Sequence, residues 1–134
     1  MNSITEYIKE LERRVDRLER VGGGFDDVWH DLTLLNGWSG YSDTIWGTPQ
    51  YRKLASGLVI VRGLISGGTT SSGTNMAQLP VGYRPKRRYI FVQREANDGF
   101  YGLRVMEDGY LRIGDNGIAN NSWVSIACSF YAEQ

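Results

Sequence analysis

Apolar residues at the start of the chain recur at alternating spacings of four and three. Charged residues fill most of the positions between them. Two apolar residues per heptad form the narrow seam of a coiled coil, so we expect an α-helix at 4–21 that associates with further copies of the chain. The seam residues are Ile4, Ile8, Leu11, Val15 and Leu18.

The number of helices in this coiled coil depends on two signals that disagree. β-Branched residues at position a with leucine at position d favour two helices. By contrast, the segment from Arg14 to Glu19 resembles the Arg-h-x-x-h-Glu motif (h, apolar) of short three-stranded coiled coils. In that motif the arginine reaches the glutamate of the next helix while its stem covers the seam. We favour a parallel homotrimer; an amphipathic helix packed on its own head is the alternative.

From Phe25 onward, the helical spacing gives way to alternating apolar and polar residues, which are typical of strands. Turn sequences separate the alternating runs, and Asn36-Gly37 and Asp108-Gly109 suit β-hairpins. The runs predict strands at 29–35, 50–54, 58–65, 76–79, 88–94, 101–106, 110–113 and 122–131.

These elements divide the chain into a stalk and a head. We expect a coiled-coil trimerisation stalk at 1–21, a glycine-rich joint at 22–28 and an all-β head at 29–134. Short strands at close spacing predict an antiparallel β-sandwich or a jelly-roll-like barrel for the head.

Two of the expected strands also predict burial. In 122–131 alternate apolar residues share one face with Cys128, which we therefore expect in the core as a small hydrophobic residue. The strand at 58–65 is apolar on both faces apart from Arg62. Such a strand is covered on both sides, so we expect the domain core on one face and a neighbouring subunit on the other.

Composition argues against several classes of partner. Fifteen basic and fifteen acidic residues cancel, so no net charge attracts nucleic acid or an anionic membrane. No apolar run approaches the roughly 20 residues of a membrane helix, and the N-terminus lacks the pattern of a secretory signal. A single cysteine allows no intrachain disulfide. We expect a protein that is made in a cytoplasm and binds neither nucleic acid nor membrane.

Few residues suit catalysis. His30 is the only histidine, so one chain offers no multi-histidine zinc site and at most one triad. Of the paired carboxylates, Glu107-Asp108 falls in an expected turn and Asp26-Asp27 follows the glycines. We therefore expect no enzymatic activity, no metal site and no cofactor.

Aromatic residues in loops are the best candidates for binding. Tryptophan and tyrosine offer flat apolar faces with a polar edge, which suit sugar rings and protein anchors. One group lies in a Gly/Ser/Thr-rich stretch and a second in a polar loop. The alternative is that most of them pack the ends of the sandwich. The candidate ligand-binding residues are Trp38, Tyr41, Trp46, Tyr51, Asn97, Asp98, Phe100 and Tyr101.

A family resemblance rests on residues 57–91. The apolar run at 57–65 is followed by a Gly/Ser/Thr loop, by Leu-Pro-Val-Gly-Tyr-Arg-Pro at 79–85 and by another apolar strand. This order resembles the C-terminal head domains of bacteriophage tail-fibre and minor tail proteins. The Leu-Leu-Asn-Gly-Trp sequence at 34–38 and the Asp-Gly hairpin fit the same pattern.

The resemblance implies a homotrimeric virion protein whose head recognises a bacterial surface glycan or protein. Its N-terminus would contact other virion proteins. Such heads usually end a long fibre, whereas only residues 1–28 precede this one, so the chain is either a distal fibre fragment or a short spike. The alternatives are a capsid head-fibre or decoration protein without receptor binding and, less favoured, a polysaccharide depolymerase.

Overall fold

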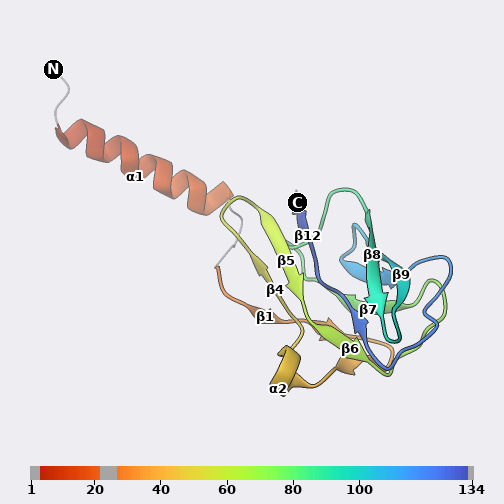
Figure 1. Cartoon of the computed structure of the whole chain (residues 1–134). Helices are drawn as coiled ribbons and strands as arrows, with labels where there is room; N and C mark the ends of the chain where they lie inside the picture. Colours follow the sequence, from red (N-terminus) through yellow and green to blue (C-terminus); the bar gives the residue numbers. More distant parts are fainter. Residues whose placement is uncertain (1–3, 22–26, 133–134) are drawn as a thin grey trace.

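The computed structural model describes residues 4–21 and 27–132; for residues 14–21 it describes the backbone alone. An N-terminal helix, α1 (Ile4–Val21), is confirmed with the predicted bounds, and a β-rich head follows it (Figure 1). Within a single chain Ile4, Ile8 and Leu11 are exposed, so association through this stripe stays a prediction. The side chains of Arg14, Val15, Leu18 and Glu19 lie outside the described residues.

The described part of the head consists of two antiparallel sheets and a short helix, α2 (Asp43–Trp46), so the predicted all-β class is confirmed. The four-stranded sheet has the order β1 (His30–Asp31), β4 (Gln50–Lys53), β5 (Leu58–Arg62) and β12 (Cys128–Tyr131). The eight-stranded sheet has the order β2 (Thr33–Leu34), β7 (Asn75–Gln78), β10 (Tyr110–Ile113), β9 (Gly99–Val105), β8 (Tyr89–Glu95), β11 (Val124–Ser125), β6 (Leu64–Ser66) and β3 (Ser39–Gly40).

The eight-stranded sheet curls into a nearly closed barrel. Its edge strands, β2 and β3, are separated in the sequence only by residues 35–38. The hairpin predicted at Asn36-Gly37 is therefore wrong, because the strands on either side of it do not pair. Instead β2 pairs with β7 and β3 pairs with β6. The hairpin predicted at Asp108-Gly109 is confirmed between β9 and β10.

Three predicted strands are each divided between the two sheets at the same level of the head. The run at 58–65 breaks at Gly63, whose φ of 130° favours glycine. The run at 122–131 breaks beside it, where Ile126 N donates to Gly63 O (3.2 Å), and the run at 29–35 breaks at Leu32, whose N donates to Pro49 O (2.9 Å). At this level each of the three segments passes from one sheet to the other. The apolar alternation of the sequence alone does not reveal this crossing.

The two sheets enclose one apolar core. In β11 and β12, Val124 and Phe130 are buried, and Cys128 packs against the same cluster, as the alternation predicted. In β5 one face is buried, whereas Leu58 and Ile60 on the other face are half-buried, and their cover by a neighbouring subunit stays a prediction. The side chains that fill the core are Leu32, Trp38, Tyr51, Val59, Val61, Ile65, Met76, Ala77, Leu79, Tyr101, Leu103, Val105, Leu111, Ile113, Ile118, Val124, Ile126 and Phe130.

Gly63 offers a direct test of this sheet-to-sheet crossing. An added Cβ would meet Pro49 Cα at 2.8 Å in a backbone conformation that other residues rarely adopt. We expect Gly63→Ala to lower the free energy of unfolding by at least about 2 kcal/mol in denaturant titration. Gly102→Ala is the control, because its Cβ meets no atom within 4 Å, and we expect a change within about 0.5 kcal/mol. Equal effects of the two changes would contradict the crossing.

Cys128 gives a second test of the packing. Burial raises the pKa of its thiol to about 12. Because the thiolate is the reactive form, we expect iodoacetamide at pH 8 to modify the native chain far more slowly than the chain in guanidinium, as followed by mass spectrometry. Equal rates in the two conditions would place the thiol outside the core.

Candidate functional site

The eight candidate ligand-binding residues do not form one cluster. The side chains of Trp38, Tyr51 and Tyr101 are buried. Trp38 Nε1 donates to Thr69 O (3.1 Å), and the Tyr101 hydroxyl donates to Ser125 O (2.5 Å). Burial, the largest cause, and nearby ionisable groups raise the pKa of Tyr101. These three side chains fit the packing alternative that the sequence left open.

Trp46 is the last residue of α2, which lies in an exposed loop at residues 41–47, the α2 loop. This tryptophan and its neighbour Ile45 are both largely exposed, and Tyr41 at the start of the loop is half-buried. Ser42 adopts a left-handed conformation (φ 51°), and its carbonyl accepts hydrogen bonds from the N–H groups of Ile45 and Trp46. The loop therefore presents two large apolar side chains on a hydrogen-bonded turn.

Asn97, Asp98 and Phe100 lie together at the β8–β9 hairpin. Asn97 and Asp98 both have φ of 63°, as a type I′ turn requires of its two central residues. Asp98 Oδ1 accepts a hydrogen bond from Arg94 Nη2 (2.6 Å), and the Arg94 guanidinium lies 5.3 Å from the centre of the Phe100 ring. The ring nonetheless remains 65% exposed.

A hollow of about 320 Å³ extends from this hairpin over the outer face of β8 and β9 to residues 114–116, which follow β10. Strand alternation places Phe100, Gly102 and Arg104 on this face of β9, and β8 contributes Ile90 and Val92 from the neighbouring register positions. These two aliphatic side chains are 69% and 76% exposed. The absence of a side chain at Gly102 opens the middle of the face.

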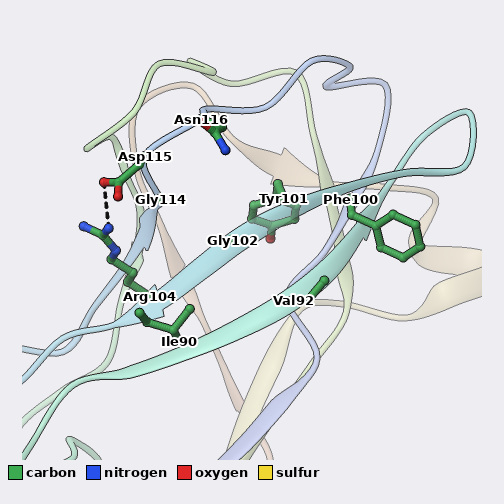
Figure 2. Close-up of a pocket in the computed structure, with 9 residues that line it drawn as sticks. All are labelled: Ile90, Val92, Phe100, Tyr101, Gly102, Arg104, Gly114, Asp115 and Asn116. Atoms are coloured by element: carbon green, nitrogen blue, oxygen red, sulfur yellow. Dashed lines mark hydrogen bonds and ion pairs between the residues drawn. The ribbon is translucent and has the colours of Figure 1, made fainter.

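The two ends of the hollow differ in chemistry. At one end, Arg104 Nη2 donates to Asp115 Oδ1 (2.6 Å), with Asn116 beside the pair. At the other end lies the ring of Phe100, with Gly102 between them (Figure 2). The face thus combines an apolar floor with donors and acceptors at its edge, the mixture that small-ligand sites use.

Sequence reasoning found Phe100 but missed the rest of this face. Two signals were present. The run Tyr-Ile-Phe-Val at 89–92 is apolar on both faces, so half of it had to lie outside the core. The Phe-x-Gly-x-Arg pattern at 100–104 places a ring, a gap and a cation on one side of a strand.

Two of the four basic residues at 84–88 bind other parts of the chain. Arg84 Nε donates to Leu79 O (2.9 Å) beside a second hollow of about 230 Å³. Arg88 pairs with Glu107 (3.1 Å). The pKa of Glu107 is lowered, first by a hydrogen bond from its own backbone amide and then by Arg88. Lys86 and Arg87 are exposed, so the cluster matches a solvated loop.

The start of the head is fixed by a stack on the outer face of the four-stranded sheet. The ring of Trp29 lies 3.7 Å from the Arg62 guanidinium and 5.7 Å from that of Arg52. Arg52 also pairs with Asp27 (2.6 Å). Within the head, the β4–β5 turn lies at one end, whereas α2 and the end of β8 lie at the opposite end (Figure 1). The β8–β9 hairpin and the α2 loop, which expose Phe100 and Trp46, are therefore remote from the β4–β5 turn.

The described residues contain no group of three or more His, Cys, Asp or Glu side chains that could hold a metal ion. A membrane-crossing helix is likewise not found among the described residues.

No family model and no curated protein matches this sequence. Two solved structures do. One is the receptor binding protein (gp15) of Listeria phage PSA. The match covers 100% of this chain and 82% of the Listeria phage protein, with a TM-score of 0.61 and 16% sequence identity. The other is the head domain of phage bIL170, which is described with the receptor binding domains of lactococcal phages. The match covers 80% of this chain and 99% of the bIL170 head domain, with a TM-score of 0.55 and 19% sequence identity. The fold is that of phage receptor-binding head domains. The resemblance found in the sequence is thus confirmed for the fold.

Proposed function

We propose that this chain is a non-enzymatic bacteriophage virion protein whose head recognises a glycan or protein on a bacterial surface. One observation carries the proposal. In a fold shared with two phage receptor-binding proteins, the face over Gly102 leaves Ile90, Val92 and Phe100 exposed next to an ion pair. A soluble domain that leaves such side chains uncovered commonly uses them for contact.

We further propose that three copies assemble through the heptad stripe of α1, with the stalk attached to other virion proteins. The stripe residues whose side chains the structure describes are exposed in the single chain. A helix of this length is only marginally stable in isolation. Three identical heads convert weak contacts into strong attachment, because the second and third contacts form at high effective concentration.

The assembly can be tested by replacing Ile8, Leu11 and Val15 together with serine. Because the change removes three seam residues, we expect a mass of three chains for the unchanged protein and a shift toward one chain for the variant in analytical ultracentrifugation. The β-sheet signal in circular dichroism is the control that the head remains folded in the variant. A monomeric unchanged protein would refute the trimer.

Recognition can be tested with the fluorescently labelled chain on cells of Listeria, Lactococcus and unrelated bacteria. We expect retention on a subset of strains, and a loss of about 100-fold or more in apparent affinity for the triple-serine variant, whose heads are intact but no longer linked. Retention no greater than that of an unrelated trimeric coiled coil on every strain would count against receptor binding.

The second candidate is a capsid head-fibre or decoration protein that contacts only other virion proteins. The exposed Ile45 and Trp46 on the α2 loop favour it, since adjacent aliphatic and aromatic side chains suit an apolar pocket on a protein. Cryo-electron microscopy of the virion separates the candidates. A position on the capsid with the α2 loop buried against a neighbour would favour the structural role.

A further inference from the structure

We infer that the hollow over Gly102 is the ligand site and that it binds a neutral sugar residue of a surface glycan. This inference rests on the proposed function and specifies its site and its ligand class. Four features of the hollow support it: the glycine, the apolar floor, the polar edge and the charge.

The fold does not require glycine at position 102. Its φ is not in the left-handed region, and an added Cβ would meet no atom within 4 Å. Glycine in the middle of a strand weakens the strand, and it often marks a place where another molecule approaches the backbone closely. Gly114, which directly follows β10, is different, because its Cβ would meet Gly102 O at 3.1 Å and packing alone accounts for it. Gly102 keeps the hollow open at a cost to the strand.

The floor suits the C–H face of a sugar ring. Val92 lies opposite Gly102 in the β8–β9 register, and Phe100 lies opposite Arg94. Arg94 places its guanidinium near the Phe100 ring, which helps to hold the ring in position while leaving most of its surface exposed. A rigid ring and a β-branched side chain lose little conformational freedom on binding.

The edge suits sugar hydroxyl groups, which both donate and accept. A guanidinium carries five N–H donors, and a carboxylate accepts at two oxygens. The pairing of Arg104 Nη2 with Asp115 Oδ1 leaves further donors and acceptors on both groups, and Asp115 is 80% exposed. Asn116 adds an amide with both functions. Hydroxyls that bridge these groups would be oriented from both sides.

The charges around the hollow select a neutral ligand. Arg104 is paired with Asp115 and Arg94 with Asp98, each at 2.6 Å. The next cation on this face, Arg112, is held toward β7 by Asn75 Oδ1 (2.8 Å) and does not line the hollow. An anionic group would gain no uncompensated cation inside the hollow, because the Asp115 carboxylate already neutralises the Arg104 guanidinium.

The test uses the full-length chain on an array of defined saccharides, with neutral hexoses and N-acetylhexosamines on one part and uronic, sialylated and phosphorylated sugars on the other. We expect binding to neutral spots that changes less than about twofold between 50 and 500 mM NaCl, because screening does not weaken a contact with an uncharged ligand.

Gly102→Val places a branched side chain in the hollow, and its Cβ meets no atom within 4 Å. Asp115→Asn removes the negative charge that pairs with Arg104 and replaces one acceptor oxygen by an amide donor. We expect each to weaken neutral-sugar binding at least about tenfold, which corresponds to about 1.4 kcal/mol. Ser39→Val is the matched control, because it adds a β-branched side chain at an exposed position of the same sheet outside the hollow. It should leave binding unchanged. Circular dichroism and solution mass check that the variants fold and assemble.

Each other outcome has a defined meaning. Binding only to anionic spots, with strong salt dependence, overturns the neutral ligand while the proposed function stands. Neutral binding that Gly102→Val leaves intact overturns the site. Blank arrays with retention on cells that protease treatment abolishes indicate a protein receptor and overturn the inference alone. Blank arrays together with no retention on cells of the bacterial panel overturn both the inference and the proposed function.

Discussion

The architecture of the head depends on the place where the chain crosses from one sheet to the other. Gly63 makes the crossing possible, because only glycine adopts its φ of 130° with Pro49 Cα so close. Leu32 and Ile126 cross at the same level through hydrogen bonds to Pro49 and Gly63. Because both sheets are continuous with these three segments, their inner faces meet in one core, which the buried apolar side chains of both sheets fill.

The same constraint decides which side chains stay outside. Residues that alternate with the core positions of β8 and β9 must face solvent, and this sets Ile90, Val92 and Phe100 on one surface. On the other sheet, Trp29 stacks on two arginines and fixes the first residues of the head. The β4–β5 turn and the exposed β8–β9 hairpin lie at opposite ends of the head.

The outer face of β8 and β9 combines exposed apolar side chains with paired charges. Its cations are compensated locally by carboxylates, so the face carries little net charge although it contains several ionised groups. Exposed ion pairs of this kind contribute little to stability, and their value here lies in oriented donors and acceptors. The apolar side chains beside them occupy rigid strands rather than loops, so binding would require little ordering.

Local patterns in the sequence correctly predict the helix at 4–21, the all-β class and most strand positions, because heptad and period-two patterns are local signals of burial. The sequence also named Phe100, Asp98 and Trp46 as candidate binding residues, and the structure leaves them exposed, but it could not separate them from Trp38, Tyr51 and Tyr101, which pack inside. Only the tertiary structure decided where strands change sheet, that β2 and β3 lie at opposite edges, and that Gly102 opens a hollow beside Arg104 and Asp115. These features depend on contacts between residues far apart in the chain, and local periodicity carries no information on which strands become neighbours.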